Sequence, residues 1–193
     1  MFAKAGAARA VGFDISQSAI RIANDIKGSL GEKKVEFFTM ACEEMNFPDQ
    51  SFDYVFGENI LHHVDIPKTI SETRRVLKRG GKAVFCEWVE SPFFDRIRNS
   101  RIFLRAFPHG GYRSRQESYV TAYEKKLTQR DLEFVKNAFS STELYYRYLF
   151  TRVAIFLHAG RIEKYFQIFD YNLMKIFPFL NRYAAAVIIK CAK

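Results

Sequence analysis

The first residues whose types and order could do chemistry lie near the N-terminus, in the segment Ala10–Ser16. An apolar run ends at Asp14, and Ser16 is a residue type that often caps the N-terminus of a helix. A carboxylate in this place can accept hydrogen bonds from two adjacent hydroxyl groups, as it does on the ribose of nucleotide cofactors in doubly wound folds. Asp14 is therefore a candidate binding residue.

A second group of reactive side chains follows the apolar strand predicted over 52–56. The tripeptide Gly57–Asn59 comes directly after it, where open α/β sheets bind their ligands. His62 and His63 stand a few residues further on, and an imidazole there could remove a proton from a substrate hydroxyl or an activated carbon. The simpler interpretation, in which one histidine packs at the start of a helix and the other is partly exposed, stays open.

The elements that would position these residues alternate along the chain. We expect strands over 10–14, 35–39, 52–56, 83–88, 143–150 and 184–190, and helices over 17–30, 66–79, 93–106, 129–139 and 152–176. Lys78 and Arg79 followed by Gly80 predict the end of the second helix, with the glycine as a left-handed C-cap. The alternation predicts an α/β fold with a largely parallel sheet.

Three motifs occur in an order that is more specific than any one of them. They are Phe47-Pro-Asp-Gln-Ser-Phe-Asp53, Leu61-His-His63 and Arg75-Val-Leu-Lys-Arg-Gly-Gly81. In this order and at about these distances they resemble the class I S-adenosylmethionine-dependent methyltransferases, in particular the small-molecule branch that includes the ubiquinone and menaquinone type. The resemblance implies a doubly wound, Rossmann-like α/β sheet with a helical insert near the C-terminus. It also implies S-adenosylmethionine as cofactor and methyl transfer to a small, apolar acceptor.

The same resemblance assigns binding roles residue by residue. It implies that Asp14 binds the ribose hydroxyls and that Ile15 packs on the adenine. It also implies that Cys42 and Glu43 lie in the loop that reads the adenine edge. The sequence departs from the family in this loop, because Ala41 stands where the family usually has aspartate. Recognition of the adenine amino group would then fall to a neighbouring glutamate.

Gly57, Glu58 and Asn59 match the family's site for the methionine part of the cofactor, where Glu58 would contact the ammonium group or remain solvated. No catalytic residue and no metal ligand is assigned, because methyl transfer from a sulfonium is an in-line displacement that can run on positioning in a dry pocket. Four further side chains are pocket candidates for which a structural role is the simpler interpretation: Glu87, Trp88, His109 and Tyr112.

The segment before Asp14 is shorter than the resemblance requires. The family places a first strand and a glycine-rich turn ahead of the strand that ends in the ribose-binding acid, whereas only Met1–Arg9 precede this strand here. We therefore expect an N-terminally truncated sheet, in which the remaining strands close up, another segment fills the vacant slot, or the fold is compromised. Exposed strand edges would favour self-association.

The composition fits one domain over 1–193 with a substantial core, including a lid region at 89–126 and a helical insert at 152–181. The three cysteines are odd in number and lack metal-ligand spacing, which disfavours disulfides and zinc and favours a cytoplasmic location. No apolar run approaches the roughly 20 residues that span a bilayer.

The net charge of +9 belongs to the second half of the chain. Residues 1–89 hold as many acidic as basic side chains, whereas residues 90–193 carry the whole excess together with clustered tyrosines and phenylalanines. Such a half could contact a membrane surface or a nucleic acid, or its aromatic residues could face the core beneath a solvated basic surface. Methylation of nucleic-acid bases is disfavoured, because Gly57-Glu-Asn-Ile60 lacks the Asn/Asp-Pro-Pro-Tyr/Phe pattern.

Two other functions stay open at this stage. The chain could be a non-catalytic remnant that binds a partner or a membrane surface through its basic, aromatic C-terminal half. It could also be a nicotinamide-dependent oxidoreductase, because an acid after the second strand suits NAD as well, although the motifs at 47–53 and 75–81 count against it. A small-molecule substrate is expected for either class of enzyme.

Overall fold

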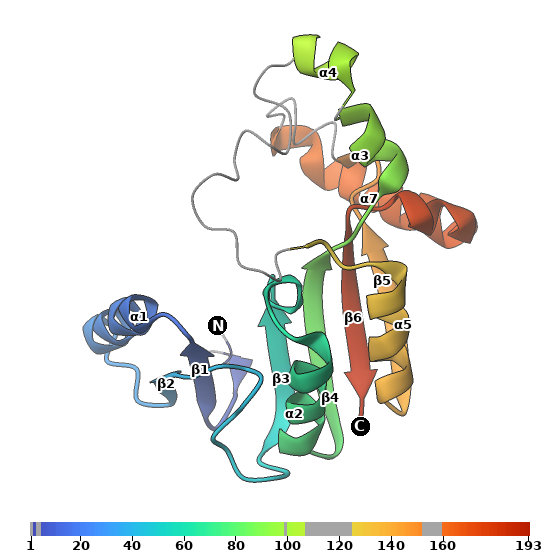
Figure 1. Cartoon of the computed structure of the whole chain (residues 1–193). Coiled ribbons are helices and arrows are strands. Elements are labelled where there is room, and N and C mark those ends of the chain that lie inside the picture. Colours follow the sequence, from blue (N-terminus) through green and yellow to red (C-terminus); the bar gives the residue numbers. More distant parts are fainter. Residues whose placement is uncertain (1, 3–4, 99, 107–124, 152–159) are drawn as a thin grey trace. The chain divides into compact units, whose positions relative to one another are not determined.

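The computed structural model describes residues 1–193 except 1, 3–4, 99, 107–124 and 152–159 (Figure 1). The chain divides into two compact units, Met1–Pro48 and Asp49–Lys193. The single domain expected over 1–193 stays a prediction. Among the described residues, no helix combines the length and the apolarity that crossing a bilayer requires.

The first unit is one parallel strand pair joined by a helix. Its elements are β1 (Ala10–Asp14), α1 (Gln17–Ser29) and β2 (Val35–Thr39). The Ser16 hydroxyl accepts the N–H of Ala19 at 3.2 Å, so the predicted N-cap is confirmed. Asp14 and Thr39 are register partners, and the loops after both strands therefore leave the same end of this two-stranded sheet.

The second unit is built on a separate four-stranded sheet with the order β3-β4-β6-β5. Its strands are β3 (Phe52–Glu58), β4 (Leu77–Trp88), β5 (Ser141–Arg147) and β6 (Ala186–Ala192). β3 and β4 are parallel, whereas β6 is antiparallel to both β4 and β5. The carboxyl ends of β3, β4 and β5 therefore lie at the same end of the sheet (Figure 1).

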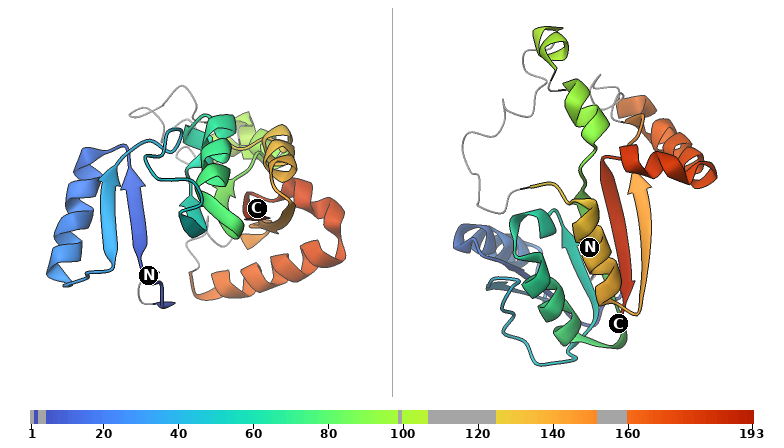
Figure 2. Two further views of the ribbon diagram at one scale, coloured as in Figure 1. Left: turned by 90° about the horizontal axis from the view of Figure 1, so that it is seen from below. Right: turned by 45° about the vertical axis from the view of Figure 1, so that its right-hand side comes forward.

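Two helices cover one face of this sheet. They are α2 (Ile66–Val76) and α5 (Gln129–Ala138), which lie side by side (Figure 2). Both helices begin at N-caps, since Asp65 accepts the N–H of Lys68 and Thr128 forms a reciprocal capping box with Asp131. Buried apolar side chains form the core beneath them, among them Ile70, Phe85, Leu132, Val135 and Ile189.

The predicted end of the second helix was wrong. α2 stops at Val76, and Leu77 is already extended and pairs with Phe52 at the start of β4. Leu77 is fully buried, so its place in the core decides the boundary rather than the cations that follow it. Gly80 does adopt a positive φ of 72°, but it does so within β4, a few residues beyond the helix.

Further helices follow β3, β4 and β5. They are η2 (Leu61–His63), α3 (Pro92–Arg98), α4 (Arg101–Ala106), α7 (Gly160–Ile176) and η4 (Pro178–Tyr183). The single helix predicted over 93–106 was wrong, because the polar residue Ser100 separates two short helices and donates its N–H to the Ile97 carbonyl. The expected insert is helical over most of 160–181, whereas 152–159 and much of the lid region lie outside the described residues.

A buried aspartate ties α7 to the chain after β5. The Asp170 carboxylate, 1% exposed, accepts the N–H groups of Leu149, Phe150 and Thr151 at 2.8–2.9 Å and the Thr151 hydroxyl at 2.7 Å. We expect Asp170→Asn to lower the free energy of unfolding by about 2–3 kcal/mol, because an amide accepts through one atom only. Chemical denaturation measures this. Asn172→Ala, on the exposed side of α7, should change it by less than about 0.5 kcal/mol, and an equal loss in both variants would contradict the assignment.

The thiol of Cys191 lies in the core of the second unit, and burial raises its pKa to about 11. The folded state disfavours the thiolate, so stability is full below the ordinary thiol pKa and falls as the pH rises toward 11. Between about pH 9 and pH 11 the free energy of unfolding of the parent should fall by about 2 kcal/mol more than that of Cys191→Ala, which has no thiol to ionise. Denaturation at neutral and alkaline pH checks this, and parallel pH profiles for the two proteins would contradict it.

Candidate functional site

Asp14 stands at the carboxyl end of β1 with its side chain exposed. One carboxylate oxygen accepts the N–H of Ser16 at 2.7 Å, which fixes the turn into α1. The second oxygen makes no hydrogen bond within the described part of the chain, so it is available to a ligand. Ile15 follows with 74% of its side chain exposed, an unusual position for an isoleucine and one that suits contact with an apolar ligand surface.

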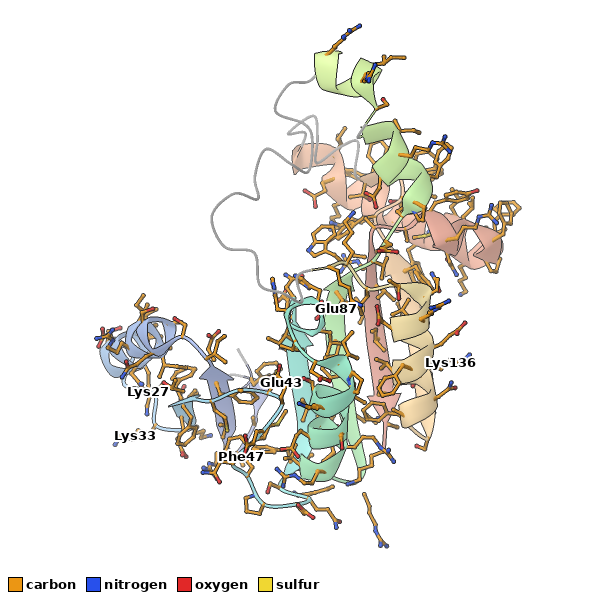
Figure 3. All side chains as sticks on the ribbon, viewed as in Figure 1. Lys27, Lys33, Glu43, Phe47, Glu87 and Lys136 are labelled. Carbon is orange, nitrogen blue, oxygen red and sulfur yellow. The ribbon has the colours of Figure 1, made fainter. Side chains whose placement is uncertain are left out.

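The loop after β2 lies beside Asp14 in the first unit. The Met40 N–H donates to the Asp14 carbonyl at 3.0 Å, so the two loops are joined at their starts. Cys42 is buried, and its thiol lies 3.5 Å from the Glu43 carboxylate. Glu43 is partly exposed, and Figure 3 shows it in the loop that leaves β2. In this loop, therefore, Glu43 is better placed than the Cys42 side chain to meet a ligand.

Packing explains the glycine at the end of β3. A Cβ atom on Gly57 would lie 2.8 Å from both Ile60 and Phe85, so no larger residue fits without displacing one of them. Asn59 continues the turn with a φ of 53° and donates its N–H to the Cys86 carbonyl at 2.9 Å. Glu58 remains exposed at the strand end, where it is the register partner of Cys86. Burial, and after it the Glu58 charge, raises the pKa of the Cys86 thiol.

A buried carboxylate holds the segment that follows this turn. Glu87, near the carboxyl end of β4 (Figure 3), has a fully buried side chain. Its Oε1 accepts the N–H groups of Ile60 and Leu61, each at 2.8 Å, and its Oε2 lies 2.8 Å from Nδ1 of His62. Glu87 thus fixes the backbone entering η2 and the orientation of one imidazole ring.

The contact with Glu87 gives the two nitrogens of His62 different roles. An ionised carboxylate can only accept, so Nδ1 carries a proton. In the neutral ring Nε2 is then the acceptor, which is the arrangement that a general base needs. The His62 side chain is 14% exposed, and its ring lies 4.0 Å from that of His63. His62 is therefore oriented by a buried partner, whereas the sequence alone left both a general-base role and a plain packing role open for the two histidines.

The structure places the predicted binding residues in two groups. Asp14, Ile15 and the loop carrying Cys42 and Glu43 gather in the first unit, while Gly57–Asn59 stand at the end of β3 in the second. The part that sequence reasoning missed is the Glu87–His62 pair. The one signal for this pair in the sequence was that His62 follows the end of one predicted strand and Glu87 lies at the end of the next. Two other pocket candidates, His109 and Tyr112, lie outside the described residues.

A groove of about 460 Å³ lies between α7 and the strands β5 and β6. Its lining combines tyrosines with cations: Tyr145, Arg147, Tyr148, Lys164, Tyr171 and Lys190 are among the residues that form it. The Lys190 ammonium lies 4.4 Å from the centre of the Tyr145 ring, and the Arg147 guanidinium lies 5.0 Å from that of Tyr148. The groove therefore offers both aromatic surface and positive charge.

Solved structures identify the class of fold. The chain is similar to YcgJ from Bacillus subtilis, with a TM-score of 0.58 and 16% identity over 96% of this chain and 82% of that one. It is also similar to geranyl diphosphate C-methyltransferase from Streptomyces coelicolor A3(2), with a TM-score of 0.57 and 15% identity over 96% of this chain and 63% of that one. The predicted Rossmann-like methyltransferase fold is confirmed.

Sequence comparisons find similar proteins over part of the chain. Residues 1–85 match the family model described as a methyltransferase domain. The chain is 37% identical over 131 residues to the ubiquinone/menaquinone biosynthesis C-methyltransferase UbiE of Geobacter sulfurreducens, which covers 64% of this chain and 48% of that protein. The similarity is to a methyltransferase of the ubiquinone and menaquinone type, which is the resemblance that the motifs indicated. The chain spans about half the length of the curated relatives it matches.

Proposed function

We propose that the chain binds S-adenosylmethionine and supports methyl transfer to a small, apolar acceptor. The observation that carries this proposal is the exposed carboxylate of Asp14 at the carboxyl end of β1. Ser16 holds one of its oxygens through its N–H, and the other is available to the vicinal hydroxyls of a ribose. Asp14 would thus bind the ribose, and the exposed Ile15 would cover one face of the adenine.

The family resemblance assigns two further groups to the cofactor, one in each unit. Glu43 in the loop after β2 would accept from the adenine amino group, in place of the aspartate that the family usually has there. Glu58 at the end of β3 would face the ammonium of the methionine part, supported by the turn at Gly57 and Asn59. When bound, the cofactor supplies an activated methyl group on a sulfonium, and the chain's own residues position the acceptor for in-line transfer.

His62 would accept the proton that the acceptor loses. Its Nε2 is the free nitrogen of the ring, because Nδ1 is held by Glu87 at 2.8 Å. The buried Glu87 carboxylate would stabilise the imidazolium formed during transfer, as a fixed counter-charge in a site of low dielectric. In this proposal His62 is the catalytic base and Glu87 is a positioning residue.

Aromatic side chains at the same end of the sheet support an apolar acceptor. Trp88 at the end of β4 is 41% exposed, and its ring stacks on that of Tyr148 at 5.9 Å. Phe93 on α3 is 55% exposed. Such surfaces favour an acceptor that is quinone-like, isoprenoid or polyketide-like over a sugar. The Streptomyces enzyme named above, whose fold is similar, methylates an isoprenoid diphosphate according to its name.

Calorimetric titration of the 193-residue chain with S-adenosylhomocysteine tests the first half of the proposal. We expect micromolar binding. Absence of binding by a chain that circular dichroism shows to be folded would overturn it and would favour the non-catalytic alternative. The second half is tested by transfer of a labelled methyl group to a panel of quinols, isoprenoids and polyketide-like phenols, with sugars and RNA as negative controls.

A further inference from the structure

The helix α7 divides into three stripes that differ in chemistry. Residues spaced by four, three and four positions share a helix face. One stripe points inward and contains the buried Asp170 and Met174, together with Glu163, which accepts from Gln167 at 2.8 Å. Asp170 is thus buried against the rest of the protein, whereas the half-buried Glu163 is engaged by Gln167 of the same helix.

The stripe on the outer side of α7 is apolar. Tyr165 is 71% exposed, Phe169 52% and Ile176 68%, and we call these three residues the apolar stripe; the exposed Asn172 lies on the same face, between Phe169 and Ile176. The exposed rings of Phe177 and Phe179, 6.1 Å apart, extend it into η4. Large apolar side chains gathered on one exposed face are uncommon on a protein surface unless that face contacts something.

The stripe beside it is basic. It consists of Lys164, Ile168, Tyr171 and Lys175, all exposed, and we call it the basic stripe. Three of these residues, Lys164, Ile168 and Tyr171, also line the groove between α7 and the sheet, to which β5 and β6 contribute Arg147 and Lys190. Within the described part of α7 and η4, the acidic side chains are the buried Asp170 and the half-buried Glu163, so cations predominate among the exposed charged side chains.

We propose that α7 and η4 dock this protein on the surface of an anionic lipid bilayer. The apolar stripe would enter the boundary between headgroups and acyl chains, where aromatic side chains are favoured. The basic stripe and the neighbouring groove would lie at the level of the phosphates, with the lysine stems along the apolar boundary. This proposal does not depend on the chain's activity.

Charge argues for this occupant over two others. A second copy of the chain would bring the same cations against themselves, at a net charge of +9 for each copy. An acidic protein surface would satisfy the lysines but leave the apolar stripe without a matching environment. An anionic bilayer satisfies both stripes at once, and contact at its surface requires no helix that crosses it.

Flotation of the whole chain with vesicles tests the proposal. We expect binding to phosphatidylcholine vesicles that contain about 30% phosphatidylserine, at least about tenfold weaker binding to phosphatidylcholine alone, and release in about 0.5 M NaCl. The double variants Lys164→Glu/Lys175→Glu and Tyr165→Ser/Phe169→Ser should each weaken binding by at least about tenfold. All four positions are exposed, so both variants should keep the parent's melting temperature and circular dichroism.

The matched control is Lys33→Glu/Lys136→Glu, which makes the same change of net charge on exposed lysines of other elements (Figure 3). It should retain at least about half of the parent's binding, because docking depends on place as well as charge. Equal loss in the control would reduce the effect to net charge and overturn the proposal. Equal binding to neutral vesicles would overturn it too. Soluble polyglutamate is a probe for an acidic protein. If the chain binds polyglutamate, and Tyr165→Ser/Phe169→Ser binds it equally well, the surface would be assigned to an acidic protein instead.

Discussion

Glu87→Gln is expected to leave the protein folded while it lowers the rate of methyl transfer about 100-fold or more. The glutamine oxygen can still accept the N–H groups of Ile60 and Leu61, which now go to Oε1 of Glu87. Its amide nitrogen, however, donates toward Nδ1 of His62, where a carboxylate oxygen now accepts. The neutral ring must then carry its proton on Nε2, and the lone pair that would take the acceptor's proton is lost.

Two measurements separate this effect from a general loss of structure. The Kd for S-adenosylhomocysteine should stay within about twofold of the parent's, because Glu87 contacts η2 and has no role in the proposed cofactor site. Heteronuclear NMR of the imidazole nitrogens should show the His62 proton moving from Nδ1 to Nε2. Glu90→Gln, the same substitution on an exposed residue next to β4, is the control expected to change neither.

The His62→Gln and Glu87→Gln variants together test the hypothesis that His62 is the catalytic base. If His62→Gln and Glu87→Gln both retain the parent's rate while cofactor binding persists, the pair is structural and methyl transfer runs on positioning alone. Loss of cofactor binding in the same variants would instead place the pair in the cofactor site.

Removing the carboxylate altogether should be worse for stability than neutralising it. Glu87→Ala would leave two buried N–H groups and the ring N–H of His62 without an acceptor. We expect it to lower the free energy of unfolding by about 3–5 kcal/mol, against less than about 2 kcal/mol for Glu87→Gln. Similar losses in the two variants would mean that Oε1 does not hold the start of η2.

Local signals predicted the elements that local chemistry determines. The N-cap at Ser16 lies where the sequence placed it, because a cap is a contact between residues two or three positions apart. The strands over 10–14 and 35–39 also have the predicted bounds.

Long-range contacts account for what the sequence did not predict. The sequence predicts Leu77 in the last turn of an amphipathic helix. In the structure Leu77 belongs to β4, where it pairs with Phe52 and is fully buried. Likewise, Glu87 and His62 are 25 positions apart. They come into contact only because β3 and β4 pair in parallel, so that the ends of both strands lie at the same end of the sheet. The family resemblance predicted the binding residues. A motif gives residue types, however, and does not show that Glu87 contacts and orients the imidazole ring of His62.

Asp14→Asn should weaken the binding of S-adenosylhomocysteine by about 10- to 100-fold without unfolding the first unit. The asparagine oxygen can keep the hydrogen bond to the Ser16 N–H, now 2.7 Å long, so the turn into α1 survives. What is lost is a charged acceptor for two ribose hydroxyls, and each charge-assisted hydrogen bond of this kind contributes about 1.5–3 kcal/mol. The free energy of unfolding should change by less than about 1 kcal/mol, because the side chain is exposed.

Asp25→Asn is the matched control for this variant, since Asp25 is an exposed acid of the same unit, on α1, and its substitution makes the same change of charge. Titration calorimetry on the three proteins decides between a specific contact and general electrostatics. If both variants weaken binding alike, the cofactor senses only the charge of the unit. If neither does, Asp14 merely holds the turn at Ser16, and the ribose must be bound elsewhere. If only Asp14→Asn weakens binding, the ribose is bound at the end of β1, because the lost carboxylate is the only difference between this variant and the parent.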